Sequence, residues 1–397
     1  MALLIQKYGG SSIPTPARIR AVARHIAASH REGHDVVVVM SAMGGVTDQL
    51  LAQARDISTA PAARELDALL ATGEQASNAL TAMALRDLGV EARSLTGWQA
   101  GILTSPDHGR AAVTDVRPHR VRDALDHGVI PLVTGFQGAE PGDADITTLG
   151  RGGSDTTAVA LAAALEADAC EIYTDVAGVY TADPKVVPEA RPLARLTHRH
   201  MYEMAAGGAK VLALPSVEHA RQHGVTLHIR SSYDDSPGTV VSGTVSGAEY
   251  WGPGPRVIAV THDPHGTRTS LPGPLGPTAT ALLSIVTPAP AFAGPTRPYA
   301  HPWHTARQGA FPEEGIATAS LVGSGLCAHP ETAATLDGAL TRAGIAYAPL
   351  TVTDTRITVM CHPAALDDTV RVLHAAFLTA TPEPPVARRG GRLAVRS

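Results

Sequence analysis

Two kinds of hydrophobic pattern alternate along the first 230 residues of the chain. Residues 36–40 (Val-Val-Val-Val-Met) form a continuous apolar run, which is typical of a strand buried on both faces. Residues 15–32 instead carry Ile19, Val22 and Ile26 at helical spacing, with arginines at positions between them. Strand-like and helix-like segments alternate here, so we expect an α/β sandwich around a mostly parallel sheet.

Other segments of this region repeat the alternation. Short apolar runs predict further strands at residues 3–5, 130–133 and 170–174. Helices are expected at residues 61–88, which are rich in Ala and Leu, and at residues 154–166, where Ser154 or Asp155 can serve as the N-cap. Several predicted strands end in glycine-rich turns, and α/β proteins bind their ligands at such strand ends.

The pattern changes after about residue 245. Ten of the 30 prolines fall within residues 251–300, where Gly-Pro sequences interrupt any periodicity. This stretch contains two isolated strand candidates, at residues 257–260 and 281–286, and no convincing helix. We interpret residues 246–315 as a linker or a degenerate small domain.

Regular patterning returns at Ile316. The pattern predicts, in order, a strand, a helix, two strands and a second helix at residues 316–322, 330–343, 346–352, 356–361 and 363–378. This β-α-β-β-α order is half of a small ferredoxin-like domain, which we assign to residues 316–380. Residues 381–397 are expected to form a disordered tail.

Composition narrows the class of protein. The 397 residues include 32 Lys and Arg against 37 Asp and Glu, a formal net charge of −5, and 44% are hydrophobic. These values exclude disorder along the whole chain, and the lack of basic runs argues against nucleic-acid binding. Three scattered cysteines do not suggest a disulfide framework. We find neither a signal-peptide pattern nor an apolar run of membrane-spanning length, and we expect a cytoplasmic protein without membrane partners.

The first predicted strand ends in a lysine that is soon followed by two glycines. Gly9 and Gly10 let the backbone approach a phosphate, and the helix that follows offers free N–H groups. Lys7 would supply a point charge for a phosphoryl group. An ordinary strand-turn-helix with a surface lysine explains the same residues. The chain has no G-x-x-x-x-G-K-[ST] sequence, which excludes a P-loop enzyme.

A second strand end places Arg151 among three glycines, directly before a predicted helix. The planar guanidinium group suits a carboxylate bidentately, and the glycines leave room for a ligand. A mobile glycine-rich loop is the alternative interpretation. Two other strand ends, within residues 41–47 and 173–185, also run into glycine turns, and the second carries aromatic residues that could flank a base.

Together these segments resemble the amino acid kinase family, and within it the aspartate kinases. The resemblance runs nearly without interruption over residues 1–242. It is carried by residues 7–12, 41–47, 72–74, 149–155, 173–185, 209–212 and 230–232. It implies an α/β fold, the three-layer sandwich of the amino acid kinases, for residues 1–245, followed by ferredoxin-like ACT modules.

The resemblance implies an ATP-dependent kinase that phosphorylates the side-chain carboxylate of L-aspartate to 4-phospho-L-aspartate. The Mg²⁺ would be carried by ATP, with no separate metal site. A carboxylate is already ionised at neutral pH, so it needs positioning and charge neutralisation but no general base. By the resemblance, Lys7 and Lys210 would neutralise charge on the phosphoryl group, and Asp155 would hold the lysines and the amino acid in place.

The same resemblance assigns the binding residues. Arg151 would hold the α-carboxylate of aspartate, and Glu74, which we expect at a helix start, would hold its ammonium group. The rest of the implied substrate site is Ser41, Thr47, Gly152 and Ser154. The implied nucleotide site is Gly9, Gly10, Ser11, Tyr173, Thr174, Asp175, Tyr180, Asp183 and Lys185. His198, His200 and Glu203 have a metal-like spacing, and we interpret them as a solvated helix face.

The C-terminal part departs from the family. Residues 316–380 resemble one ACT domain, whereas residues 246–315, where a first ACT domain is expected, resemble the family poorly. We therefore expect weak or absent feedback inhibition by lysine and threonine, the alternative being an intact but divergent domain. A homodimer associating through the C-terminal domains is also expected.

Two other functions stay open. One is a kinase for an aspartate-like amino acid in a specialised pathway. The other is a non-catalytic regulatory partner subunit, against which the presence of both Lys7 and Asp155 argues. Glutamate and acetylglutamate kinases lack an ACT module, so residues 316–378 argue against them.

Overall fold

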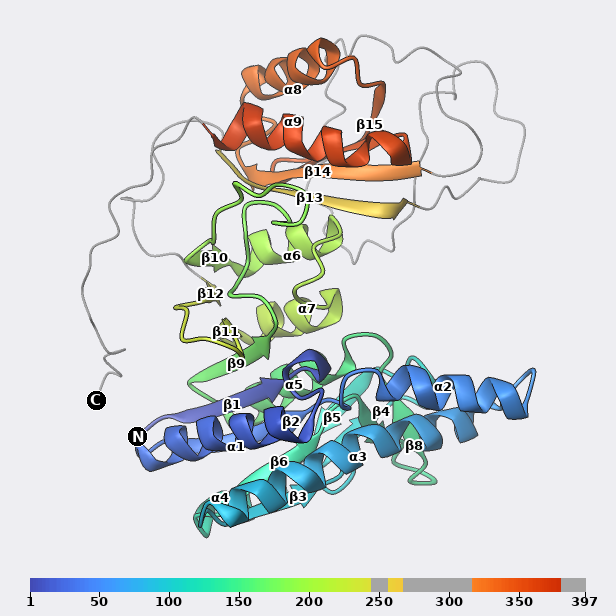
Figure 1. Ribbon diagram of the computed structural model, residues 1–397, viewed down its shortest axis with the longest axis vertical. Helices are drawn as coiled ribbons and strands as arrows, with labels where there is room; N and C mark the ends of the chain where they lie inside the picture. The colour runs from blue at the N-terminus through green and yellow to red at the C-terminus, as the bar shows by residue number, and fades with distance from the viewer. Residues whose placement is uncertain (244–255, 267–315, 380–397) are drawn as a thin grey trace.

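A computed structural model of the protein describes residues 1–243, 256–266 and 316–379 (Figure 1). Its largest element is an eight-stranded sheet. Neighbouring strands of this sheet are parallel except β11 and β12. The strand order is β10 (Arg195–Thr197), β12 (Thr239–Ser242), β11 (Leu227–Ser231), β9 (Ala169–Thr174), β1 (Leu3–Tyr8), β2 (Asp35–Met40), β6 (Ile130–Thr134) and β3 (Ala92–Leu95). The expected mostly parallel sheet is confirmed.

Helices cover both faces of this sheet. One face is covered by α1 (Pro16–Arg31) and α3 (Ala63–Asp87). The other face is covered by α4 (His119–Asp126), α5 (Gly153–Leu165), α6 (His198–Ala206) and α7 (Leu214–His223). A further helix, α2 (Val46–Ile57), has no buried residue and was not expected from the sequence. The three layers are those of the predicted sandwich (Figure 1).

The central strand β2 shows why the sequence folds in this way. Val37 and Val39 point into the core on the side of α5, whereas Val36, Val38 and Met40 point into the core on the side of α1. All five side chains are buried. Burying such a side chain stabilises the fold by about 2 kcal/mol, and only a strand between two helical layers buries both sets.

A smaller four-stranded sheet lies beside the main one. Its order is β5 (Val113–Val116), β4 (Ile102–Thr104), β7 (Gln137–Ala139) and β8 (Ile146–Thr148). β8 packs against α3. The segment that follows β8 leads into the glycine-rich loop and α5, so this sheet places one wall of the candidate site.

A second four-stranded sheet, antiparallel throughout, is built by the C-terminal part. Its order is β13 (Arg256–Gly266), β14 (Ile316–Ser324), β16 (Arg356–Cys361) and β15 (Tyr347–Val352). α8 (Pro330–Arg342) and α9 (Leu366–Leu378) pack on one face of it. α6 packs on the other face, where Ile258 and Val322 join the core of the first part (Figure 1).

The predicted β-α-β-β-α order is present in this part, with two differences. The helix predicted at residues 363–378 is a 3-10 turn, η3 (Pro363–Ala365), followed by α9, because the His362 side chain accepts a hydrogen bond from the Ala364 N–H and starts a separate turn. The strand predicted at residues 257–260 is not isolated, since it lies within β13 and pairs with β14. The strand predicted at residues 281–286 and the tail expected at 381–397 lie outside the described residues.

Among the described residues, no helix combines the length and the apolar character that crossing a membrane requires.

Candidate active site

The turn after β1 lies against the ends of β2 and β9. Gly10 begins a 3-10 turn, η1 (Gly10–Ser12), and a Cβ atom at this position would lie 2.8 Å from the Ala42 carbonyl oxygen. Only glycine fits this close approach of two strand-end loops. The Gly9 N–H donates to the Tyr173 carbonyl oxygen over 3.2 Å. Three of the segments noted in the sequence therefore meet at one edge of the sheet.

A buried ion pair stands at this edge. The Nζ atom of Lys7, on β1, lies 2.5 Å from Oδ1 of Asp155, in the first turn of α5. Both residues are less than one-tenth exposed. A Cβ atom on Gly9 would lie 3.5 Å from the Lys7 ammonium group, so the cation lies beside the glycine turn. The structure thus brings together Lys7, Asp155 and the predicted phosphate-binding turn.

Glu74 lies close to the same edge but not at a helix start. It sits in the middle of α3 and is buried, which corrects the sequence-based expectation. Its Oε1 accepts a hydrogen bond from the Ala42 N–H over 3.1 Å, whereas Oε2 is buried without a hydrogen-bond partner among the described residues. Burial raises the pKa of Glu74 to about 7. An orphaned buried carboxylate oxygen is a place for a hydrogen-bond donor from a ligand.

Two further predicted substrate residues, Ser41 and Thr47, follow β2 along the chain. The Ser41 carbonyl oxygen accepts a hydrogen bond of 2.7 Å from the Ser77 hydroxyl, one turn after Glu74 on α3. Thr47 lies in the first turn of α2. The loop after β2 is therefore tied to the helix that carries Glu74.

The glycine-rich loop makes the opposite wall. Gly150 and Gly152 have φ angles of +72° and +76°, a conformation that favours glycine, and they turn the chain from β8 into α5. Arg151 between them is exposed, whereas Ser154 is buried against Gly135, where an added Cβ would lie 2.7 Å from the Ser154 side chain.

Phe136, next to Gly135, was missed from the sequence. Its φ of +68° is unusual for a bulky residue, and its carbonyl oxygen accepts a hydrogen bond from the Leu149 N–H. A strained backbone of this kind costs about 1 kcal/mol or more and tends to occur at functional sites. No sequence signal distinguishes such a phenylalanine.

The ring of Tyr173 does not face a nucleotide. It is buried and stacks on Tyr8 with 4.8 Å between ring centroids, and its hydroxyl contacts Glu171 and His25. The proposal that this ring flanks a base is therefore wrong. The strand alternation explains this, because the tyrosine side chain points into the α1 layer while its backbone carbonyl meets Gly9.

The remaining candidates for the nucleotide site lie after β9. The Thr174 hydroxyl donates to the Asp175 carboxylate, and the Asp183 carboxylate accepts from the Lys185 backbone N–H. Tyr180 forms an isolated antiparallel β-bridge with Pro192. The side chains of Arg151, Lys185 and Lys210 are exposed and lack an ion-pair partner within the described ranges. These three exposed cations lie on loops and suit an anionic ligand, and no contact in the described residues joins them to the Lys7–Asp155 pair.

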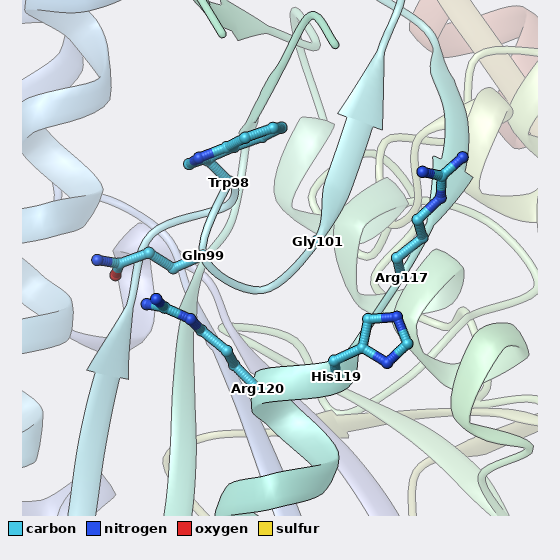
Figure 2. A pocket seen from close by; sticks show the side chains of 6 residues that line it. All are labelled: Trp98, Gln99, Gly101, Arg117, His119 and Arg120. Carbon is cyan, nitrogen blue, oxygen red and sulfur yellow. The ribbon is translucent and has the colours of Figure 1, made fainter.

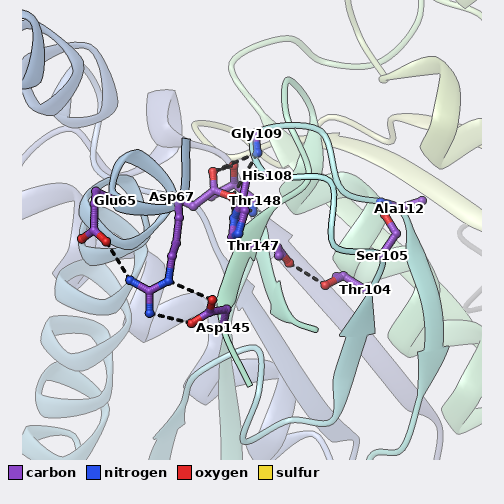
Figure 3. Close-up of polar contacts among 11 residues, drawn as sticks. Glu65, Asp67, Thr104, Ser105, His108, Gly109, Ala112, Asp145, Thr147 and Thr148 are labelled. Atoms are coloured by element: carbon purple, nitrogen blue, oxygen red, sulfur yellow. Dashed lines mark hydrogen bonds and ion pairs between the residues drawn. The ribbon is translucent and has the colours of Figure 1, made fainter. Parts of the chain in front are cut away.

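Asp67 and its partners were also missed. This buried aspartate on α3 accepts hydrogen bonds from His108, Gly109 and Thr148, which come from two other segments (Figure 3). The partners are distant in sequence, so no local motif marks them.

The histidine motif on α6 is not a solvated face. His198 and His200 are both buried, and they contact the Val225 carbonyl oxygen and the Ser324 hydroxyl. The Glu203 carboxylate accepts from the Thr355 hydroxyl and pairs with Arg356. His200 and Glu203 therefore join α6 to the antiparallel C-terminal sheet, whereas His198 bonds within the first part of the chain. In the part of the chain that the structure describes, no three His, Cys, Asp or Glu side chains are grouped as metal ligands.

A separate surface depression lies at the start of α4, lined by Trp98, Gln99, Gly101, Arg117, His119 and Arg120 (Figure 2). The five side chains that line it are exposed, and the Arg117 guanidinium group is bonded to Asp115. None of the predicted site residues lines it.

Comparisons with known proteins agree on one family. The profile described as the amino acid kinase family matches residues 2–231. An aspartokinase of Mycolicibacterium smegmatis is 44% identical over 95% of this chain and 96% of its own length. An aspartokinase of Corynebacterium glutamicum is 58% identical over 62% of this chain and 58% of its own length. The crystal structure of E. coli aspartokinase III with aspartate and ADP covers 94% of this chain and 99% of its own, with a TM-score of 0.74; at 20% identity it shows the fold alone.

Proposed function

The chain belongs to the amino acid kinase family and, within it, to the aspartate kinases, and on this premise we propose that it transfers the γ-phosphoryl group of MgATP to the side-chain carboxylate of L-aspartate, giving 4-phospho-L-aspartate. One observation carries the assignment of the site. The buried Lys7–Asp155 pair stands beside the glycine turn, within the same edge of the sheet as the orphaned oxygen of Glu74.

Phosphoryl transfer to a carboxylate requires charge neutralisation rather than proton transfer. The attacking carboxylate and the phosphoryl group are both anions, so their approach must be made favourable by fixed cations. Lys7, held in place by Asp155, supplies one such charge at the strand end. Lys210 supplies a second from the loop after α6, where it is exposed and has no ion-pair partner among the described residues. Gly10 and Ser11 offer backbone N–H groups to the phosphates, and Gly9, whose own N–H donates to the Tyr173 carbonyl oxygen, lets them approach the backbone.

The amino acid is oriented by two groups of opposite charge. The Oε2 atom of Glu74 accepts from the substrate ammonium group, and Arg151 forms two hydrogen bonds to the α-carboxylate. Ser41, Thr47, Gly152 and Ser154 complete this side of the site. With these two groups fixed, the β-carboxylate of aspartate is directed toward Lys7.

The nucleotide lies on the loop after β9. We assign its phosphates and ribose to backbone and polar groups of this loop, and the cation of Lys185 to the phosphates. The loop residues are Thr174, Asp175, Tyr180, Asp183 and Lys185, together with the backbone but not the ring of Tyr173. The Mg²⁺ ion enters bound to ATP as part of the substrate.

The test is trapping of the acyl phosphate with hydroxylamine. The full chain with MgATP should form aspartyl hydroxamate from L-aspartate and none from N-acetyl-L-aspartate, because acetylation removes the ammonium group that Glu74 binds. Equal use of both acids would contradict the assignment of Glu74. A higher kcat/KM for an analogue modified at the β-carbon would favour a specialised substrate. No product from any acid would favour a non-catalytic subunit.

We further propose that feedback inhibition by lysine and threonine is weak or absent. This rests on the sequence of residues 246–315, where a first ACT domain is expected and where ten of 30 prolines fall within residues 251–300. The second ACT domain that we propose for residues 316–380 also takes in β13, which pairs with β14, and two copies associate through it. Hydroxamate formation should persist at millimolar lysine plus threonine, and an inhibition constant in the low millimolar range or below would contradict this.

A further inference from the structure

Asp67 is the most heavily hydrogen-bonded carboxylate that the proposed reaction does not use. It lies on α3 and is 1% exposed. Its oxygens accept from His108 Nδ1 over 2.8 Å, from the Gly109 N–H over 3.0 and 3.1 Å, and from the N–H and hydroxyl of Thr148 over 3.1 and 2.5 Å. Figure 3 shows these groups converging on the aspartate from two sides.

These contacts join three separate segments of the site. The first is α3, which presents Glu74 two helical turns after Asp67. The second is the loop between β4 and β5, which contains His108 and Gly109. The third is the end of β8, where Thr148 precedes the glycine-rich loop and Arg151. Asp67 therefore fixes the loop that carries the arginine onto the helix that carries the glutamate.

The loop between β4 and β5 strengthens this connection. A Cβ atom on Gly150 would lie 3.3 Å from the Gly109 carbonyl oxygen, and the Ala111 N–H donates to the Thr148 carbonyl oxygen over 2.9 Å. The Asp67 carboxylate therefore holds both Thr148, which precedes the glycine-rich loop, and Gly109, which lies beside Gly150 of that loop.

A neighbouring ion pair gives the natural comparison. Arg64, one turn earlier on α3, bonds to Asp145 near the start of β8, but the side chain of this arginine is 56% exposed. Exposed pairs contribute little, whereas a buried carboxylate with several donors is costly to disrupt. A carboxylate also accepts at every lone pair, while an asparagine amide would turn an N–H₂ group toward the N–H donors.

We propose that Asp67 is a positioning residue for the amino acid substrate, which sets the distance between Glu74 and Arg151 without touching the ligand. The inference rests on the proposed function, in which these two side chains hold the ammonium and α-carboxylate groups. Asp67 fixes the amino acid side of the site and leaves the nucleotide loop after β9 unaffected.

Asp67→Asn tests this with kinetics. The KM for L-aspartate should rise roughly 10- to 100-fold while the KM for MgATP stays within about 2-fold, because only the loop with Arg151 moves. Thr148→Val should shift the same KM in the same direction by less, and Thr148→Ser, which keeps the hydroxyl, should restore it. Asp145→Asn, which breaks the exposed pair on the same wall, is the matched control and should change neither constant. A folded Asp67→Asn enzyme with both constants unchanged, or both raised equally, overturns the inference.

A second measurement does not need the reaction. Backbone amide hydrogen exchange at residues 148–152 should be faster in Asp67→Asn than in the wild type, with residues 9–12 unchanged. Were the wild type inactive on L-aspartate, the proposed function would fail while this result still decided whether Asp67 fixes the loop. Unchanged exchange at residues 148–152 overturns the inference in either case.

Discussion

At the scale of single residues, the candidate site is dominated by charges that are removed from water. Lys7 and Asp155 neutralise each other, whereas Glu74 accepts from the Ala42 N–H and has no counter-charge among the described residues. The first arrangement stabilises both ionised side chains. The second costs free energy until a cation enters the site.

The charge of Glu74 makes the stability of the empty protein depend on pH. Its pKa is about 7 in the folded chain against a usual value of 4.5, so the folded state holds this proton more tightly than the unfolded state. The stabilisation from the proton is complete below the unfolded pKa and is lost as pH rises toward 7, a loss of about 3 kcal/mol. Glu74→Gln should therefore melt further above the wild type at pH 8 than at pH 5.

Glu65→Gln, at an exposed position of the same helix, is the control and should leave the melting temperature nearly unchanged at both pH values. Saturating L-aspartate should reduce the difference in melting temperature between Glu74→Gln and the wild type at pH 8. The reason is that the ammonium group of the substrate compensates the charge of Glu74 in the wild type. If Glu74→Gln and the wild type differed in melting temperature by the same amount at pH 5 and pH 8, the Glu74 carboxylate would not be ionising in this range.

The Lys7–Asp155 pair predicts strong coupling between two substitutions. Asp155→Asn leaves a buried ammonium group without its partner and should lower the free energy of unfolding by about 3 kcal/mol. Lys7→Met added to Asp155→Asn should recover part of that loss, since it removes the uncompensated charge. Thermal unfolding of the two single variants and the double variant measures this, and additive losses would contradict a coupled pair.

At the scale of elements, α9 holds the loop that carries the nucleotide candidates. The Arg371 side chain donates to the Val186 carbonyl oxygen over 3.0 Å, and His374 contacts the Thr181 hydroxyl over 2.9 Å. Arg191, near the end of this loop, donates to the Leu378 carbonyl oxygen over 2.8 Å. The loop is therefore positioned by the last described helix of the chain.

If these contacts position the loop, removing them should affect the binding of the nucleotide and leave the binding of L-aspartate unchanged. Replacing Arg371 and His374 by Ala should raise the KM for MgATP roughly 3- to 10-fold, the equivalent of one to two hydrogen bonds, with the KM for L-aspartate unchanged. Arg342→Ala is the matched control, because that side chain bonds within α8 to the Gly338 carbonyl oxygen. Equal effects of the two changes would argue against positioning by α9.

Local patterns predicted the elements better than they predicted the positions of side chains. The continuous Val run gave β2, and the helical spacing of Ile19, Val22 and Ile26 gave α1, because each pattern expresses the burial of one element. Glu74 was placed at a helix start because Gly73 precedes it, but Gly73 lies against Ala42 inside α3. Packing, not capping, requires that glycine.

At the scale of the whole molecule, the eight-stranded sheet and the antiparallel C-terminal sheet (β13, β14, β16 and β15) meet through α6. Buried His200 and the Glu203–Arg356 pair face the antiparallel C-terminal sheet, and a Cβ atom on Gly207 would lie 2.3 Å from the Thr261 hydroxyl oxygen. Sequence alone assigned this helix a solvated face, because nothing local shows which charged helix a later domain will cover. The role of Asp67 could not be predicted from the sequence for the same reason, since its hydrogen-bond partners come from two distant segments.

Gly208 lies just after α6 and close to β13, and a second glycine of the chain provides a control for its substitution. Gly208 has a φ of +99°, and an added Cβ would lie 2.3 Å from the His262 carbonyl oxygen on β13. Gly128 also has a positive φ, +67°, but has open space around it. Gly208→Ala should lower the melting temperature more than Gly128→Ala, and it should also reduce turnover because Lys210 lies two residues later. Equal losses in the two variants would show that backbone strain alone, and not the contact with the second sheet, accounts for the effect.

We expect phosphorylation of the aspartate side chain by this chain to depend on the Lys7–Asp155 pair at the reaction centre. The most direct measurement is ATP-dependent formation of aspartyl hydroxamate by the full chain, beside the folded Asp155→Asn variant. We predict turnover with L-aspartate in the wild type and a loss of about 100-fold or more in kcat in the variant. Hydroxamate formation at a comparable rate by both proteins would contradict the account.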